Sequence, residues 1–305
     1  MSRRRWLAAA LIVVAAAGGC GADDADWERA ACDPARPQPS GAHELAVGDR
    51  RALLHVPAAY DGSEAYPLVF SWHGYGSSAD DHLVYADLRP QAEDGRFLVV
   101  VPQGEGDPTR FNLTAGIEGE TDDVGFAAAL IDHVAAEWCL DEARVYSTGV
   151  SNGAGMSALL ACRMPDRIAA VGMVALVIHF DGCAGPPTPA MGMMGDEDLV
   201  VPIQGGEVNC CGGWPIAPAA ESMQRWADAA GCEGRREKQV AVGVQRTTWH
   251  RCDGDAEVQY LELRQHGHTW PGGPDVSMLG PTSQAIDAAE VLWDFFRRFS
   301  LDEGS

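Results

Sequence analysis

Short apolar runs recur along the chain and are separated by polar turns and by segments of helical periodicity. The main runs cover residues 67–72, 97–101, 145–148, 169–177 and 191–194. Runs of this length are typical of parallel strands buried on both faces, because the helices of such a fold cover both sides of the sheet. Two earlier segments, 44–47 and 52–56, alternate between apolar and polar residues and predict a hairpin across Gly48 and Asp49.

Helical periodicity is clearest over residues 123–138, where apolar side chains recur at three- and four-residue steps, and over 283–299. Strands that alternate with helices predict right-handed crossovers. The fold class that follows is α/β, with a doubly wound and mostly parallel sheet flanked by helices. Neither an internal repeat nor a linker to a second domain interrupts the pattern, so residues 42–300 are expected to form one domain.

The first residues have the pattern of a signal peptide. Three arginines at positions 3–5 precede an apolar run at 6–17 that is too short to span a membrane. The small residues that follow end in Cys20 and resemble a bacterial lipobox, which implies a diacylglyceryl group on this cysteine; cleavage without lipidation is the alternative. We expect a lipoprotein-type signal peptide over 1–19, an acidic tether over 20–41, and export as a cell-surface or periplasm-facing lipoprotein or as a secreted protein.

The net charge of the chain limits which molecules it is expected to bind. The formal net charge is −22, and the sequence pI is about 4.6. Electrostatic repulsion therefore disfavours nucleic acid and anionic lipid, and leaves a lipid anchor as the one expected membrane contact. We expect a monomer.

The chain contains nine cysteines, or eight once a lipidated Cys20 is set aside. An even number in an exported chain favours disulfides, although the sequence alone does not fix their connectivity. The competing interpretation is a metal site formed by Cys210, Cys211, His250 and Cys252. Neither Cys-x-x-Cys nor His-x-x-x-His spacing occurs among them, so we expect no metal.

The pentapeptide at 149–153, Gly-Val-Ser-Asn-Gly, lies between a strand-like run at 144–148 and a helix-like run at 154–162. A serine on a sharp strand-to-helix turn requires glycine two residues before and after it, because side chains there would collide with the backbone. The turn exposes the hydroxyl, and the following helix directs its first amides toward developing negative charge. We therefore expect Ser151 to be the nucleophile of an α/β-hydrolase fold.

A serine hydroxyl needs a general base, which is itself oriented by a carboxylate. In this fold the order along the chain is serine, acid, histidine. The run at 191–194 is followed by Asp196, Glu197 and Asp198, at the edge where ligands collect in open α/β sheets. We expect Asp198 to be the acid and the other two carboxylates to be solvated.

Two histidines follow the next strand-like run, 257–263, and either is a candidate for the base. His266 and His268 are separated by one glycine, so their spacing hardly distinguishes them. His268 is favoured because it lies further into the loop. The other histidines are expected to be surface or core residues.

An oxyanion hole requires two backbone amides directed at the substrate oxygen. A glycine-rich turn at 71–76 follows the early run 67–70 and can supply one of them. We assign the amides of Tyr75 and Asn152. His73 precedes the serine in the chain, so we expect it to shape this turn by hydrogen bonding and not to act as a base.

Several motifs are together specific: Trp72-His73-Gly74-Tyr75-Gly76-Ser77-Ser78, Asp122-Asp123-Val124-Gly125-Phe126, Cys139-Leu140-Asp141, Thr148-Gly149-Val150-Ser151-Asn152-Gly153, Leu160-Ala161-Cys162 and Gly267-His268-Thr269-Trp270-Pro271-Gly272. With them the chain, from about residue 32 to residue 299, resembles a family of secreted esterases that includes feruloyl esterases, acetylxylan esterases and polyhydroxybutyrate depolymerases. The resemblance implies that His268 is the base. It also aligns the aspartate of the family's His-Gly-Thr-x-Asp loop with Asp198, although Met194 and Asp196 depart from that pattern.

The resemblance further implies a set of disulfides. The implied pairs are Cys32 with Cys139, Cys162 with Cys183, and Cys232 with Cys252. Cys210 and Cys211 are then left over, and we expect a vicinal disulfide between them.

These residues predict a serine carboxylic ester hydrolase that needs no cofactor and acts through an acyl-enzyme. Its expected substrates are feruloyl or acetyl esters of plant polysaccharide, because the appended polymer-binding domain of many polyester depolymerases is not present. Trp270, Tyr75 and Trp214 are expected to contact the substrate. Trp214 lies in an insertion at 203–218 that is equally compatible with a stapled surface loop. The alternatives are a polyhydroxybutyrate depolymerase, an acyltransferase and a non-catalytic surface-binding lipoprotein.

Overall fold

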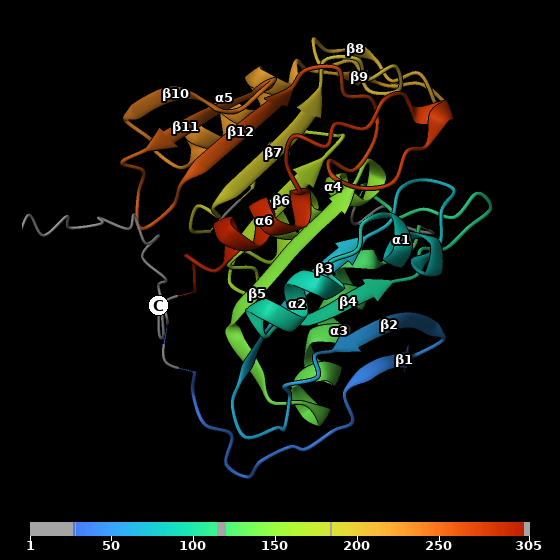
Figure 1. The fold of residues 1–305 in the computed structure, drawn as a ribbon, viewed down its shortest axis with the longest axis vertical. Coiled ribbons are helices and arrows are strands. Elements are labelled where there is room, and N and C mark those ends of the chain that lie inside the picture. The colour runs from blue at the N-terminus through green and yellow to red at the C-terminus, as the bar shows by residue number, and fades with distance from the viewer. Residues whose placement is uncertain (1–26, 28, 115–119, 184, 302–305) are drawn as a thin grey trace, which may run out of the picture.

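The computed structural model describes residue 27 and residues 29–114, 120–183 and 185–301. The signal peptide and the lipidated Cys20 that the sequence predicts lie outside these residues. Within them the chain forms three layers, with a ten-stranded sheet between two layers of helices (Figure 1). No helix in the described part of the chain is long and apolar enough to cross a membrane.

The strand order in the sheet is β1-β2-β4-β3-β5-β6-β7-β12-β11-β10. Between β4 and β12 in this order neighbouring strands are parallel, whereas both edges of the sheet are antiparallel hairpins. The mostly parallel, doubly wound sheet is therefore confirmed. Its strands are β1 (Gly41–Val47), β2 (Arg50–Val56), β3 (Tyr66–Trp72), β4 (Leu98–Pro102), β5 (Leu140–Val150), β6 (Ala170–Val174), β7 (Ala190–Gly195), β10 (Gly234–Ala241), β11 (Val244–His250) and β12 (Val258–Leu263).

Helices cover both faces of this sheet, and each face has its own apolar cluster. The central strands β3, β4, β6 and β7 are buried along their whole length, which explains their continuous apolar sequences. One face carries α3 (Asp123–Glu137), α4 (Asn152–Arg163) and α5 (Ala219–Ala229); the other, nearer the viewer in Figure 1, carries α1 (Ala79–Tyr85), α2 (Arg89–Gly95) and α6 (Ala288–Phe296).

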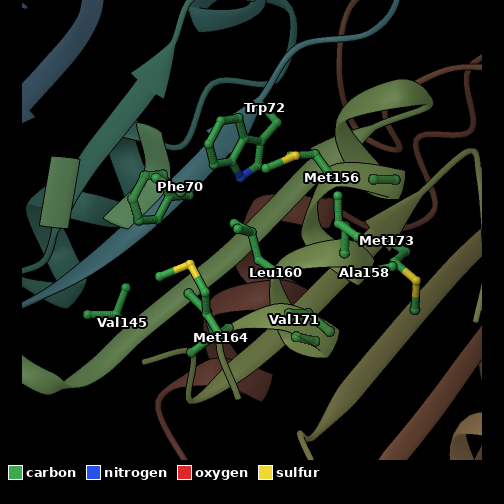
Figure 2. Packing of buried hydrophobic residues seen from close by; sticks show 14 of the residues in the cluster. Phe70, Trp72, Val145, Met156, Ala158, Leu160, Met164, Val171 and Met173 are labelled. Atoms are coloured by element: carbon green, nitrogen blue, oxygen red, sulfur yellow. The ribbon is translucent and has the colours of Figure 1, made fainter. Parts of the chain in front are cut away.

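Helix α4 packs directly on the centre of the sheet. Figure 2 shows Met156 and Leu160 of this helix, and Met164 directly after it, beside Phe70 and Trp72 of β3. All five side chains are buried, and burying a side chain of this size contributes roughly 1.5–3 kcal/mol. The helix that follows the candidate nucleophile is therefore held firmly in place.

A buried chain of hydrogen bonds adds a polar link in the same region. Trp72 Nε1 donates to Ser147 Oγ at 2.9 Å, and Ser147 Oγ donates to Ser157 Oγ at 2.9 Å. Ser157 Oγ in turn donates to the carbonyl of Gly153 at 3.3 Å. These bonds join β3, β5 and the first turns of α4.

The structure corrects two predicted boundaries. The strand expected over 169–177 ends at Val174, because Ala175 has a φ of 59° and turns the chain away from the sheet. The helix expected over 283–299 begins only at Ala288, because the side chain of Asp287 caps it by accepting hydrogen bonds from the next turn. The hairpin of β10 and β11 and the helices α1, α2 and α5 are not predicted by the sequence pattern.

The described part of the expected tether packs against the domain. A disulfide joins Cys32 to Cys139, and the backbone beside Cys32 pairs with the segment before β3. Residues 29–41 therefore belong to the folded domain. The tether predicted over 20–41 overlaps these residues, which the disulfide implied by the family resemblance holds to the domain.

Four disulfides are present in the described residues. They have the connectivity that the family resemblance implies, and the two remaining cysteines form a vicinal pair. The pairs are Cys32–Cys139, Cys162–Cys183, Cys210–Cys211 and Cys232–Cys252.

Removing the Cys32–Cys139 disulfide by replacing both residues with alanine is expected to lower the free energy of unfolding by about 2–5 kcal/mol. The reason is that this bond closes a loop with a sequence separation of 107, so it restricts the unfolded chain strongly. Urea denaturation measures the effect. The matched control removes Cys210–Cys211, which closes no loop, and should cost less than about 1 kcal/mol. Equal losses in the two variants would contradict the loop-closure argument.

Candidate active site

Ser151 lies in a sharp turn between β5, which ends at Val150, and α4, which begins at Asn152. Its φ of 56° and ψ of −117° are strained for a residue with a side chain. Two backbone bonds hold this conformation: the Ser151 amide donates to the carbonyl of Val174 at 2.8 Å, and the Ser151 carbonyl accepts from the amide of Gly155 at 3.0 Å. The turn therefore has the geometry of the elbow that the sequence predicts.

The glycines on either side of Ser151 are sterically required. A Cβ atom on Gly149 would lie 2.6 Å from the backbone of Gly153 and 2.7 Å from the carbonyl oxygen of Trp72. A Cβ atom on Gly153 would lie 2.1 Å from that same oxygen. The elbow packs so closely on β3 that only glycine fits at both positions.

Asp198 and His268 are brought together from two neighbouring parallel strands. Asp198 follows β7, His268 follows β12, and Asp198 Oδ2 lies 2.7 Å from His268 Nδ1. The Asp198 side chain is fully buried. Its other oxygen, Oδ1, accepts hydrogen bonds from the amides of Val200 at 2.9 Å and Val201 at 2.8 Å, which fixes the orientation of the carboxylate.

The structure separates the two histidines that the sequence leaves as alternatives. His266 Nδ1 accepts from the amide of Ser283 at 2.9 Å, and its Nε2 lies 3.1 Å from the carbonyl of Thr269. Burial lowers the pKa of His266, so the ring is neutral, and both of its nitrogens are engaged by the backbone. His266 therefore braces the loop, whereas His268 is paired with a carboxylate.

The three carboxylates after β7 are also distinguished. Asp196 Oδ1 accepts from the amide of Gln265 at 2.6 Å and so joins the loops after β7 and β12. Glu197 is exposed. Asp198 alone among the three is paired with a histidine.

The glycine-rich turn after β3 lies beside the elbow. A Cβ atom on Gly74 would be 3.7 Å from the Cβ of Ser151. His73 shapes this turn, because its Nε2 accepts from the amide of Gly104 at 2.9 Å while its Nδ1 lies 2.8 Å from the carbonyl of Gly74. Burial lowers the pKa of His73, which keeps the ring neutral in this arrangement. The amide of Tyr75 follows directly in the same turn.

Asn152 has a second function that the sequence does not predict. Its side chain pairs with the backbone of Phe111, accepting from the amide at 2.7 Å and donating to the carbonyl at 3.0 Å. This pairing holds the loop before α3 against the start of α4. The Asn152 amide is at the first turn of α4, where backbone donors have no acceptor within the helix.

The aromatic residues expected at the substrate differ in exposure. Tyr75 is 37% exposed, and Trp214 is half-buried between the short strands β8 (Gly206–Glu207) and β9 (Pro215–Ile216). Trp270 does not match the expectation of a ligand platform: it is only 2% exposed and packs in the apolar cluster on the α6 side of the sheet. Its amide donates to the hydroxyl of Tyr85 at 2.9 Å, so Trp270 supports the histidine loop from the core.

The insertion that carries the vicinal disulfide is fastened to the acid turn. Asn209 donates from its amide to the carbonyl of Val200 and from Nδ2 to the carbonyl of Leu199, both at 2.8 Å. The vicinal pair Cys210–Cys211 follows immediately. The sequence does not predict this contact, because an asparagine in a loop can form hydrogen bonds with many different backbone groups or with solvent.

Replacing Asn209 with aspartate is expected to reduce kcat for a short acyl ester about fivefold, because one hydrogen bond worth about 1 kcal/mol is lost from the turn that orients Asp198. The aspartate keeps the shape but cannot donate to the carbonyl of Leu199. Steady-state kinetics with p-nitrophenyl acetate measure the effect. Gln204→Ala, an exposed change in the same insertion, is the control; an equal effect of both variants would exclude a specific contact.

The sulfur atoms of the alternative metal site are not available as ligands. Cys210 and Cys211 are bonded to each other, and Cys252 is bonded to Cys232. A thiolate is the form of cysteine that binds metal. The two cysteines of the insertion therefore form a disulfide cross-link in this structure.

Comparisons with known proteins find esterases among the relatives of this chain. A family model described as Esterase PHB depolymerase matches residues 52–203. The chain is similar to probable feruloyl esterase C of Aspergillus terreus, with 31% identity over 262 residues that cover 82% of this chain and 84% of that protein. It is 25% identical over 261 residues to feruloyl esterase B of Piromyces equi, which covers 83% of this chain but 46% of that protein, about half its length.

Solved structures share the fold. An acetyl xylan esterase from Aspergillus awamori matches with a TM-score of 0.59 at 14% identity, covering 75% of this chain and 94% of that chain. A thermostable esterase matches with a TM-score of 0.52 at 14% identity, covering 85% of this chain and 62% of that chain. At this level of identity the likeness concerns the fold alone.

Proposed function

Since the chain belongs to the family of feruloyl esterases and polyhydroxybutyrate depolymerase-like esterases, which makes it an α/β-hydrolase and a carboxylic ester hydrolase, we propose that it acts through Ser151, His268 and Asp198 on feruloyl or acetyl esters of plant polysaccharide. One observation carries the assignment of residues. The buried carboxylate of Asp198 meets His268 Nδ1 at 2.7 Å, after the serine elbow and in the chain order of this fold.

The reaction begins when His268 Nε2 takes the proton of Ser151 and the hydroxyl oxygen attacks the ester carbonyl. His268 returns that proton to the leaving alcohol as the tetrahedral intermediate collapses to the acyl-enzyme. Water then repeats the sequence and releases the free acid. Asp198 holds the Nδ1–H tautomer of His268 and stabilises the imidazolium, without itself taking up the proton.

Two amides stabilise the developing oxyanion in this proposal. The amide of Asn152 begins α4, where the helix dipole favours negative charge, and the amide of Tyr75 lies in the turn that touches Ser151 through Gly74. Because His73 and Phe111 fix these two segments through hydrogen bonds, the donors are oriented before substrate binds. Such preorganised donors are worth about 2.7–4 kcal/mol each in related chemistry.

Exposed apolar side chains next to the site support an acyl group with apolar surface. Leu199, directly after Asp198, is 77% exposed, and its carbonyl is held by Asn209. Met278 is also exposed, in the 3-10 helix (Ser277–Leu279) whose last carbonyl accepts from the amide of His268 at 2.7 Å. Together with Tyr75, Leu199 and Met278 place apolar side chains around the proposed site. Such surfaces are suited to contact an aromatic acyl group such as ferulate.

The disulfides are consistent with an exported protein. We propose that Cys20 carries the lipid anchor and that the folded domain is a monomer. The short distance in sequence between Cys20 and Cys32 would then hold the domain close to the membrane surface.

The substrate proposal is tested by comparing methyl ferulate, acetylated xylan and amorphous polyhydroxybutyrate with one preparation of enzyme. We expect release of ferulate or acetate and little or no release of hydroxybutyrate. Activity confined to the polyester would overturn this substrate order in favour of a depolymerase. The same reaction with a sugar acceptor distinguishes an acyltransferase, because transfer would yield acylated sugar in place of free acid; absence of turnover on all three would favour a binding lipoprotein.

A further inference from the structure

A second polar site lies on the face of the sheet that α6 covers only in part. In Figure 1, α6 lies over the centre of the sheet, and the hairpin of β10 and β11 extends beyond it. Arg236, Thr248 and Gln259 are in register across β10, β11 and β12, so their side chains share one face. Together with residues of α6 they line a cavity of about 340 Å³.

Positive charge gathers at this cavity in a protein that is otherwise acidic. The whole chain has 22 Lys and Arg against 44 Asp and Glu. Even so, Arg236 and Arg246 line the cavity and form no ion pair with any described residue. Lys238 is opposite Arg246 on β10 and faces the same way. Two unpaired guanidinium groups in one cavity are suited to hold a carboxylate, which they bind in a bidentate manner.

The acidic groups at the cavity neutralise these arginines only in part, because each also has another partner. Glu257 Oε1 accepts from Arg298 at 2.8 Å, and Asp294 Oδ1 accepts from Arg297 at 3.1 Å. Burial alone would raise the pKa of Glu257, but its hydrogen bonds with Arg298 and Gln259 and the nearby charges of Arg298 and Arg246 lower it, so the carboxylate remains charged. The lining of the cavity keeps a net positive charge, because its three arginines, Arg236, Arg246 and Arg298, outnumber its two carboxylates, Glu257 and Asp294.

Gln259 supplies a hydrogen-bond acceptor, whereas the arginines supply donors. Its side chain is buried at 6% exposure, and its Nε2 donates to Glu257 at 2.6 Å. The remaining atom, Oε1, is buried with no hydrogen-bond partner in the described structure, which is costly unless a partner is bound. Thr248, at 4% exposure, lies beside it with a hydroxyl group. Acceptors of this kind satisfy the hydroxyl groups of a sugar.

We propose that this cavity binds a sugar residue that carries a carboxylate, with Arg236 and Arg246 holding the carboxylate and Gln259 and Thr248 contacting its hydroxyl groups. The cavity volume is within the range of about 300–1,000 Å³ that small-molecule sites occupy. Residues on one face of the sheet therefore provide groups that bind the carboxylate of the sugar and groups that bind its hydroxyls.

The position of the cavity indicates what such binding achieves. Gln259 is near the start of β12, and His268 lies in the loop beyond its other end, so the strand between them alone spans roughly 13 Å. A ligand here does not touch the reacting ester. It is instead a second contact for a polymer that carries acidic sugars; this consequence rests on the proposed function, whereas the binding itself does not.

Isothermal titration calorimetry with D-glucuronate, D-glucose and inorganic phosphate tests the proposal on the full protein. We expect saturable binding of glucuronate, and at least a tenfold weaker Kd for Arg236→Gln/Arg246→Gln. The matched control, Arg235→Gln/Arg251→Gln, removes the same charge from the same hairpin, where the two arginines pair with Glu237 and Glu233. It should change the Kd less than twofold.

Three results would overturn the site: no binding of glucuronate to the unmodified protein, an equal loss in both double variants, or binding of phosphate without glucuronate. Both variants should hydrolyse p-nitrophenyl acetate normally, because their residues lie away from the elbow. Glucuronate binding by Ser151→Ala tests the site independently of catalysis. If the esterase assignment failed, this binding would remain, and if only the sugar site failed, ester hydrolysis would remain.

Discussion

Ser151→Ala is expected to lower kcat/KM for p-nitrophenyl acetate by about 10⁴-fold or more. In the proposed mechanism the hydroxyl oxygen of Ser151 forms the acyl-enzyme, and no other residue from Gly149 to Gly153 carries a hydroxyl or thiol group that could replace it. The amides of Asn152 and Tyr75 would remain, so a small residual rate above that in water should persist. Stopped-flow or steady-state kinetics of nitrophenol release measure the loss in kcat/KM.

Ser157→Ala is the matched control for this change. Ser157 lies on the same helix, but its hydroxyl is buried and bonded to Ser147 and Gly153, away from substrate. We expect activity within about threefold of the unmodified enzyme and a loss of about 1–2 kcal/mol in stability. Circular dichroism should show that both variants are folded. An alanine at 151 that kept more than one-tenth of the activity would eliminate Ser151 as the nucleophile.

The elbow could be predicted from the sequence because its causes are local. Gly149 and Gly153 are required by collisions with backbone that lies within a few residues or on the adjacent β3, and a strand precedes and a helix follows. The buried central strands could also be predicted, because a strand that is buried on both faces has a continuous apolar sequence. Local sequence therefore defines both the scaffold and the strained turn on it.

The choice between His266 and His268 could not be made from local sequence alone. It depends on Ser283, which donates its amide to His266, and on Asp198, which is 70 residues from His268 along the chain. The contact with Asp198 requires β7 and β12 to lie side by side, because Asp198 follows β7 and His268 follows β12. The family resemblance favours His268, and its pairing with Asp198 supports that proposal.

Side-chain burial in the loops was the least predictable feature. Trp270 has the sequence context of a substrate contact, but Tyr85 of α1 holds its backbone and the ring is in the core. The edge strands β10 and β11 carry charged residues on an exposed hairpin, so their apolar pattern is weak, and the cavity lined by Arg236 and Arg246 emerges only from their register. Pairing between strands, and not composition, creates that site.

Asp198→Asn is expected to reduce kcat for p-nitrophenyl acetate by about 10⁴-fold while preserving the fold. The two amides of Val200 and Val201 that donate to Oδ1 require an oxygen atom at that position. In the asparagine variant the carbonyl oxygen must therefore stay there, and the NH₂ group must replace Oδ2 at 2.7 Å from His268 Nδ1. A donor at that point forces Nδ1 to accept.

The ring proton of His268 then moves to Nε2, which is the atom that must accept the proton of Ser151, so the variant holds the wrong tautomer. Asp196→Asn is the control, because it removes a nearby charge yet keeps the Oδ1 acceptor for the amide of Gln265. It should leave kcat within about threefold, as surface charges contribute little. The tautomer itself is measurable, since ¹⁵N chemical shifts of the imidazole distinguish a proton on Nδ1 from one on Nε2. An Asp198→Asn variant that retained Nδ1–H on His268 together with its low activity would require another cause for the loss, and equal losses in both variants would reduce Asp198 to a general electrostatic contribution.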